Sequence, residues 1–135
     1  MIIGIGTDII EISRIQKAVE NKSFLSKIYT KSEQQLFHNC NYETLAGNFA
    51  AKEAVVKAMG TGFKGCPPKE IEILRHESGK PYVVLHNKTK EIFDSMNGGN
   101  ISISISHSKE NAVAFAVIEA KEWFYGYSNN CTNES

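Results

Sequence analysis

The chain has 135 residues, of which 41% are hydrophobic and 22% charged, and its 15 basic side chains balance its 15 acidic ones. This composition predicts one compact domain, and the zero net charge argues against general binding to nucleic acid or to an anionic membrane surface. The three cysteines are widely spaced without a C-x-x-C pair, so the sequence supports neither a disulfide framework nor a structural zinc site. Because it shows no secretory leader and no apolar run of roughly 20 residues, we expect a cytoplasmic protein.

The first part of the chain is expected to form a buried strand and then a helix. Residues 1–6, MIIGIG, are apolar and β-branched and end in glycine, a pattern typical of a buried strand, and Asp8 follows at its end. Ser13 is placed to cap a helix over residues 14–21.

A second helix is expected after Thr30. Thr30 and Glu33 form the T-x-x-E pattern of a capping box, in which each residue satisfies a free backbone N–H of the other. The pattern predicts a helix over residues 31–39.

The same region is locally basic. Residues 13–31 contain a single acid, Glu20, and five basic residues, which are Arg14, Lys17, Lys22, Lys27 and Lys31. This stretch fits either a surface that meets an acidic partner or a lysine-rich helix face in solvent.

The longest predicted helix begins near Glu43 and ends at Gly60. Gly60, Thr61 and Gly62 supply a left-handed C-cap and a turn. At about 100° per residue, one broad apolar stripe predicts the core face of this helix. The stripe consists of Leu45, Phe49, Val55, Val56 and Met59.

Three charged residues interrupt this helix. Glu53 and Lys57 share a flank, in the favourable order for an exposed ion pair of about 0.2–0.5 kcal/mol. The same flank, rich in alanine and followed by Gly60 and Gly62, also suits a metal ion and a phosphate-bearing ligand. Lys52 lies within the apolar stripe, where an ammonium is costly unless it reaches solvent, an anion or a carbonyl.

The second half of the chain is expected to be mostly antiparallel β-structure. Residues 70–86 predict a hairpin with a polar turn, and residues 87–96 predict a helix. Residues 100–108, NISISISHS, alternate isoleucine and serine, which places the two residue types on opposite faces of a strand. A turn would place His107 at the rim of a sheet before a returning strand at residues 112–119.

Four blocks of the sequence together resemble a known family. They are IGIGTDIIEISRI at 3–15, LAGNFAAKEAVVKAMGTGF at 45–63, GKPYVVLHN at 79–87 and ISISISHSKENAVAFAVIE at 101–119. Their order and spacing resemble the holo-acyl-carrier-protein synthases of the 4′-phosphopantetheinyl transferase superfamily.

The resemblance implies an α+β fold with an antiparallel sheet and one long helix. It covers a single domain at residues 1–119 and leaves a C-terminal extension at residues 120–135, which we expect to fray at its end. It also implies a homotrimer with the coenzyme A site between neighbouring subunits. The aromatic residues of the extension are expected to pack onto the domain or to lie at an interface; they are Trp123, Phe124, Tyr125 and Tyr127.

The resemblance also implies the site residues. Asp8 and Glu53 match the family's Mg²⁺ ligands, which agrees with the preference of Mg²⁺ for carboxylates, water and substrate phosphates. Asp8, Glu53 and Lys57 would form the catalytic set. Coenzyme A would be bound by Lys57, Gly60, Gly62 and His107.

The implied reaction transfers phosphopantetheine from coenzyme A to a serine of apo-acyl carrier protein in fatty acid biosynthesis, releasing adenosine 3′,5′-bisphosphate. Either Glu53 or a metal-bound water would take the serine proton. The family docks the acidic carrier protein on the helix that begins at its R-I motif, which implies a role for Arg14 and Lys17.

Two alternatives and two residues stay open. The chain could be a non-catalytic module that binds an acidic protein or a nucleotide diphosphate on the same fold, or a transferase that also modifies carrier domains of polyketide or peptide synthases. Asn48 stands where many relatives carry arginine, so one ligand or partner contact is expected to differ. Lys52 has no role that the sequence defines.

Overall fold

The structure is a computed structural model, and it describes residues 1–122. In chain order its elements are β1 (Ile2–Glu11), α1 (Ile12–Ala18), α2 (Lys22–Ile28), α3 (Lys31–Gln35), α4 (Tyr42–Met59), α5 (Gly62–Gly65), the 3-10 helix η1 (Pro68–Glu70), β2 (Ile71–Arg75), β3 (Pro81–Leu85), α6 (Asn87–Ser95), β4 (Gly98–His107) and β5 (Asn111–Ala120). The fold is α+β, as predicted.

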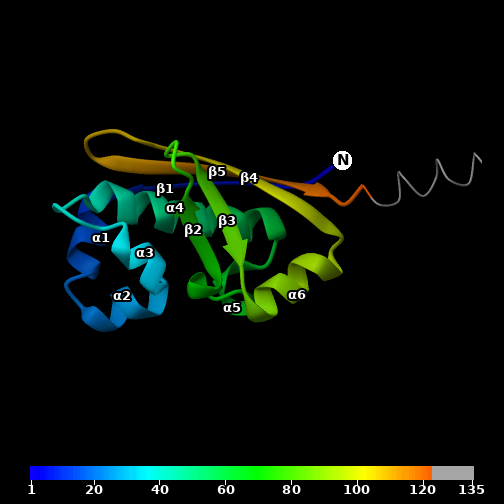
Figure 1. The fold of residues 1–135 in the computed structure, drawn as a ribbon, viewed down its shortest axis with the longest axis horizontal. Coiled ribbons are helices and arrows are strands. Elements are labelled where there is room, and N and C mark those ends of the chain that lie inside the picture. Colours follow the sequence, from blue (N-terminus) through cyan, green and yellow to red (C-terminus); the bar gives the residue numbers. More distant parts are fainter. Residues whose placement is uncertain (123–135) are drawn as a thin grey trace, which may run out of the picture.

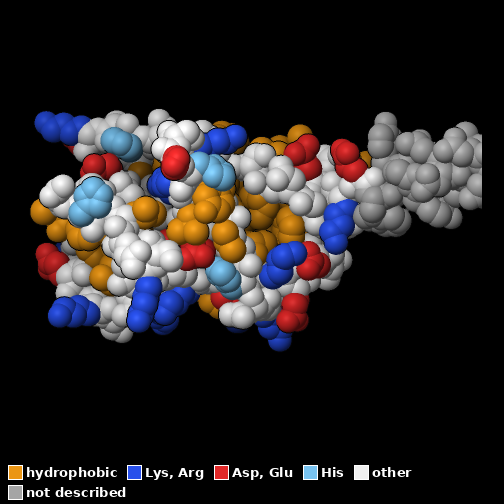
Figure 2. All heavy atoms as spheres, viewed as in Figure 1, with side chains coloured by type: hydrophobic (Ala, Val, Ile, Leu, Met, Phe, Trp, Pro, Cys, Tyr) orange, Lys and Arg blue, Asp and Glu red, His pale blue; other side chains and the backbone are white. Residues whose placement is uncertain are grey.

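Two antiparallel sheets enclose α4. The larger sheet has the order β1-β5-β4, and the smaller one is the β2–β3 hairpin. Helix α4 packs against the larger sheet, with the hairpin on another side of the helix and α1 to α3 gathered at one end of the molecule (Figure 1). Hydrophobic side chains gather on the surface where β3 lies beside β4 (Figure 2).

The glycines of β1 allow this strand to lie directly on α4. A Cβ added to Gly6 would overlap the backbone oxygen of Ala54 and lie 2.8 Å from the Ala58 nitrogen. A Cβ on Gly4 would overlap the backbone oxygen of Ala58. Gly4 and Gly6 are therefore required by space, because neither has the positive φ that makes glycine necessary elsewhere.

Helix α4 is buried on nearly all sides, so the prediction of one apolar stripe was wrong in part. Between Leu45 and Met59, every residue is buried except Phe49, Glu53 and Lys57. Phe49 was placed on the core face, but it shares the open side with the two charged residues and lies near the rings of Phe24 and Phe63. Five of the buried positions are alanines, whose small side chains allow strands to approach the helix closely; they are Ala46, Ala50, Ala51, Ala54 and Ala58.

The N-terminal boundaries differ from the prediction. Strand β1 continues past Asp8 to Glu11, because it pairs with β5 along this whole length. Helix α1 then begins at Ile12, its N-cap residue is Glu11, and no side chain caps it. The predicted cap at Ser13 is therefore wrong, because Ser13 already lies within the helix.

The next two helices were predicted in part. The capping box of Thr30 and Glu33 is confirmed, with both reciprocal hydrogen bonds present. Helix α3 ends at Gln35, before the predicted end at residue 39, and α2 was not predicted. The N-cap of α2 is Asn21, whose side chain accepts a hydrogen bond from the Ser23 N–H.

The C-terminal half agrees with the prediction. The hairpin, α6 and the pair β4–β5 are present, and Gly60 has the left-handed φ of 77° expected after α4. The isoleucines of β4 face α4, whereas its serines lie on the exposed face of the sheet. That outer face also carries Ile5, Ile9 and Phe115, which are 60%, 65% and 52% exposed.

Two further points concern the limits of the described chain. No helix among residues 1–122 is long and apolar enough to cross a membrane. The aromatic residues predicted to pack onto the domain, from Trp123 to Tyr127, lie outside the described residues.

Candidate active site

Asp8 and Lys57 form an ion pair where β1 crosses α4. The Lys57 Nζ lies 3.2 Å from Asp8 Oδ1, and it donates a second hydrogen bond of 2.9 Å to the backbone oxygen of Thr7. The Asp8 side chain is 18% exposed and that of Lys57 is 51% exposed, so the pair is open to a ligand from solvent. The spacing of Glu53 and Lys57 left open an ion pair between them or a site for a metal ion and a phosphate; in the structure the ion pair of Lys57 is with Asp8.

Glu53 lies one helical turn before Lys57 on the open side of α4. Partial burial raises the pKa of Glu53, the Asp8 carboxylate raises it further, and Lys57 lowers it. The two acids predicted as a metal pair are therefore close enough to interact electrostatically, although they come from different elements. Two repelling carboxylates favour a cation between them.

The donor chemistry of this pair fits Mg²⁺. Mg²⁺ is usually held by one or two carboxylates and completed by water and substrate phosphates, instead of an all-protein cage. The described residues contain no group of three or more His, Cys, Asp or Glu side chains that could hold a metal ion. Asp8 and Glu53 are thus a suitable pair for a cation that also binds a phosphate-bearing substrate.

The raised pKa of Glu53 leads to a stability prediction for Glu53→Gln. A carboxyl group with a folded-state pKa above its ordinary value of 4.5 destabilises the native state once it ionises, and this penalty disappears below the unfolded-state pKa. In metal-free protein at pH 7 we expect Glu53→Gln to melt at a higher temperature than wild type. Melting curves from pH 7 to pH 4 should show this advantage shrinking; an advantage independent of pH would contradict the prediction.

Gly60 and Gly62 form the turn directly after this part of α4. Their φ values of 77° and 69° favour glycine, and a Cβ at either position would meet no heavy atom within 4 Å. The Gly60 N–H bonds to the Lys57 backbone oxygen, which places the turn beside the Lys57 end of the site. The turn is open, but its predicted contact with coenzyme A stays a prediction.

His107 is exposed at the end of β4, and the structure does not bring it to Asp8 within one chain. Strand β5 lies between β1 and β4, and Ala112 pairs with Ile10 on one side and with His107 on the other. Because neighbouring strands lie about 4.8 Å apart, the two outer strands are about 10 Å apart. A ligand that bridges them, or a second copy of the chain, would be needed to join the two residues.

Arg14 and Lys17 are exposed on α1, which follows β1 without a break. The same segment of chain thus carries Asp8 and, six residues later, Arg14, which is predicted to contact the carrier protein. This continuity places the basic helix next to the candidate site.

The structure assigns positions to the two residues that the sequence left open. Lys52 is fully buried and pairs with Glu33 at 2.7 Å. Burial lowers its pKa, whereas the Glu33 carboxylate raises it. Asn48 is also fully buried and donates to Glu33 and to the Ile73 backbone oxygen, and the altered ligand or partner contact expected at this position stays a prediction.

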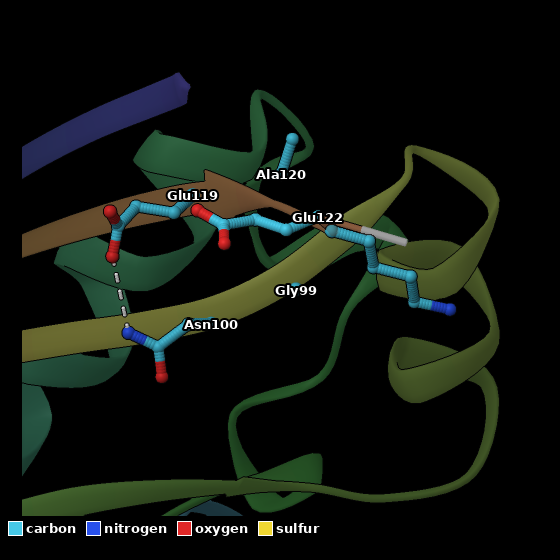
Figure 3. Close-up of a pocket in the computed structure, with 6 residues that line it drawn as sticks. Gly99, Asn100, Glu119, Ala120 and Glu122 are labelled. Carbon is cyan, nitrogen blue, oxygen red and sulfur yellow. Dashed lines mark hydrogen bonds between the residues drawn. The ribbon is translucent and has the colours of Figure 1, made fainter. Parts of the chain in front are cut away.

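A hollow of about 370 Å³ lies at another place on the larger sheet (Figure 3). Gly99, Asn100, Glu119 and Glu122 are among its lining residues, and Asn100 Nδ2 donates to Glu119 Oε1 at 3.4 Å. In the pairing of β1 with β5, Glu119 lies opposite Ile2, whereas Asp8 lies opposite Ala114. The hollow is therefore near the start of β1 and away from Asp8. Lys121 also lines the hollow, so its charged groups are two carboxylates and one ammonium, and this net negative charge disfavours a phosphate group.

The comparisons with known proteins agree with this fold. A family model of the 4′-phosphopantetheinyl transferase superfamily matches residues 4–118. The chain therefore belongs to the 4′-phosphopantetheinyl transferase superfamily. A holo-[acyl-carrier-protein] synthase of Clostridium perfringens is 51% identical over 133 residues, which cover 93% of this chain and 98% of that relative.

Two similar solved structures are both holo-[acyl-carrier-protein] synthases. Holo-[acyl-carrier-protein] synthase from Neisseria meningitidis matches with a TM-score of 0.81 at 33% identity, covering 88% of this chain and 99% of that one. The Helicobacter pylori synthase in complex with coenzyme A matches with a TM-score of 0.77 at 35% identity, covering 85% and 99%. With about half of its residues identical to a synthase over nearly the whole chain, this protein is an enzyme of the holo-[acyl-carrier-protein] synthase type.

Proposed function

We propose that this enzyme transfers 4′-phosphopantetheine from coenzyme A to a serine of apo-acyl carrier protein with Mg²⁺, releasing adenosine 3′,5′-bisphosphate, as a step of fatty acid biosynthesis in the cytoplasm. The observation that carries the proposal is the meeting of Asp8, Glu53 and Lys57 at an open surface. The complex of the Helicobacter pylori synthase with coenzyme A supports the choice of donor substrate.

Each side chain of the site has a role in this reaction. The serine oxygen attacks the phosphorus that carries pantetheine, and the bond from that phosphorus to the bridging diphosphate oxygen breaks. Lys57 offsets the negative charge on the phosphate oxygens, and Asp8 and Glu53 are the residues that would hold the ion. An Mg²⁺ ion held there would supply neutralisation of the diphosphate charge and a lower pKa of any water bound to it. Glu53 or a water takes the serine proton, and positioning accounts for much of the remaining rate gain.

Intact-mass spectrometry of apo-acyl carrier protein tests the proposal directly. After incubation with the enzyme, coenzyme A and Mg²⁺, the carrier protein should gain about 340 Da, the mass of phosphopantetheine, and EDTA should prevent the gain. A carrier protein with its acceptor serine replaced by alanine is the matched control. No gain on a folded carrier protein would contradict the proposal and favour a non-catalytic module that binds carrier protein or nucleotide.

The carrier protein is proposed to dock on the basic face of α1, through Arg14 and Lys17. At low salt we expect Arg14→Glu to raise the KM for carrier protein by about tenfold with little change in kcat, because an interface charge acts mainly on association. Steady-state kinetics at two salt concentrations measure this effect, which should diminish at high salt. Lys88→Glu, an equal charge change at an exposed position on α6, is the control. Equal KM values for Arg14→Glu and wild type would exclude this docking site.

The active enzyme is proposed to be a homotrimer, with sites between subunits. The argument is the exposed apolar face of the larger sheet, where Ile5, Ile9 and Phe115 lie uncovered in one chain. A second copy is also one way to supply His107 to the carboxylate site. Native mass spectrometry should give three times the chain mass of 15.0 kDa, and Phe115→Glu should give single chains because it buries a charge in the interface. A monomeric wild-type protein with full activity would contradict this assembly.

A further inference from the structure

A buried polar cluster on α4 lies on a different side of the helix from the candidate site. The cluster consists of Glu33 on α3 and of Asn48 and Lys52 on α4, and all three side chains are fully buried; we call it the Lys52 cluster. At about 100° per residue, Asn48 and Lys52 lie roughly 140° around the helix from Glu53 and Lys57. The cluster therefore does not touch substrate, and the proposed reaction does not explain its presence.

Every donor of the Lys52 ammonium has an acceptor. Its Nζ donates to Glu33 Oε1 at 2.7 Å, to the Pro68 backbone oxygen at 2.9 Å and to the Ile71 backbone oxygen at 2.6 Å. An ammonium has three donors, so its capacity is used completely. These bonds link α4 to α3, to η1 and to the first residue of β2.

The Glu33 carboxylate is equally well satisfied. Its Oε1 accepts from the Thr30 N–H at 3.1 Å as well as from Lys52, and its Oε2 accepts from Asn48 Nδ2 at 3.1 Å and from the Ile73 N–H at 3.3 Å. Four donors match the roughly four lone-pair sites of a carboxylate. The other Asn48 donor binds the Ile73 backbone oxygen at 3.0 Å. A rotation of α4 would break several of these bonds together.

We propose that the Lys52 cluster fixes the rotation of α4 about its own axis and thereby positions Glu53 and Lys57 against Asp8. Lys52 is then a positioning residue of the transfer reaction, and the inference rests on the proposed function. A rotation of about 20° would move a carboxylate lying about 6 Å from the helix axis by about 2 Å. Misplacement by about 1 Å can lower a rate by about 10²-fold.

Two variants separate positioning from stability. Lys52→Met leaves the buried Glu33 carboxylate unpaired, so we expect a large loss of thermal stability. Glu33→Gln combined with Lys52→Met contains no unpaired charge, and its amide can still bond to backbone groups of the site. This double variant should regain most of the lost stability, yet its kcat should stay about 10²-fold below wild type. Its KM for carrier protein should change less than about twofold, because the proposed docking residues lie on α1.

A matched control removes a buried hydrogen bond elsewhere. Thr89 is fully buried, and its hydroxyl donates to Glu70 Oε1 at 2.7 Å, a bond that joins α6 to η1 and involves no residue of α4. We expect Thr89→Val to lower the melting temperature and to keep the wild-type kcat. A folded double variant with wild-type kcat would overturn the inference, and so would an equal fall of kcat in Thr89→Val at the same loss of stability.

A binding measurement distinguishes this inference from the proposed function. Coenzyme A with Mg²⁺ should raise the melting temperature of the wild-type protein more than that of the double variant, because the misplaced Glu53 binds the ion less well. Equal increases in both proteins would overturn the inference. Failure of the wild-type protein to modify any carrier protein would contradict the proposed function alone, since the melting comparison requires no turnover.

Discussion

Asp8→Asn should lower the transfer rate by about 10³-fold, a loss of about 4 kcal/mol in transition-state stabilisation. Asparagine keeps the shape of the side chain but removes the negative charge that, with Glu53, would hold the ion. Folding should be little affected, because a partly exposed ion pair such as Asp8 with Lys57 stabilises by only about 0–1 kcal/mol. Steady-state rates measured over a range of Mg²⁺ concentrations test the prediction.

The control for Asp8→Asn is a second surface ion pair. Asp94 pairs with Lys90 at 2.7 Å on α6, and Asp94→Asn removes the same charge from a similar pair. We expect this variant to turn over at the wild-type rate. Full Mg²⁺-dependent activity in Asp8→Asn would show that Asp8 does not hold the ion.

Gly6→Ala should cause the largest loss of stability among small substitutions in β1. The new methyl group would overlap the backbone of α4 at Ala54, and backbone atoms cannot move aside as a side chain end can. We expect a loss of about 3 kcal/mol, or roughly 10 °C in Tm. Asp8 lies two residues further along the same face of β1, so displacement of the strand should also lower turnover.

Gly65→Ala is the matched control for Gly6→Ala. Gly65 has no positive φ, and a Cβ added there would meet no heavy atom within 4 Å. Its effect on the free energy of unfolding should remain within about 0.5 kcal/mol. If calorimetry gave Gly6→Ala and Gly65→Ala the same Tm, close contact between β1 and α4 could not be the reason for Gly6.

Local patterns in the sequence predicted much of the fold. The alternation of isoleucine and serine in β4 defined which face of the strand meets α4, because side chains alternate with period two. The hairpin, α6 and the capping box at Thr30 also follow from residues close in sequence. The boundary of β1 did not follow, because pairing with the distant β5 extends the strand past Asp8.

The candidate site was predicted less completely, because its contacts join distant parts of the chain. Asp8 and Glu53 were named from a family resemblance, whereas spacing along α4 allowed either an ion pair between Glu53 and Lys57 or a ligand site. Nothing in the local pattern indicated that Lys57 pairs with Asp8. The pattern at Thr30 and Glu33 was interpreted as a local cap. Only the folded chain shows that the Glu33 carboxylate also forms an ion pair with Lys52, because no local sequence pattern indicates that partner.

The pairing of β1 with β5 has a consequence for synthesis of the enzyme. The Thr7 hydroxyl donates a hydrogen bond to the Ala114 backbone oxygen, although the two residues lie 107 positions apart in the chain. During translation β1 emerges long before β5, so the backbone groups of β1 that bond to β5 stay without their partners until the end of the chain is made. The larger sheet, to which the strand carrying Asp8 belongs, is therefore complete only after nearly the whole described chain has left the ribosome, and a chain released before β5 should have no transferase activity.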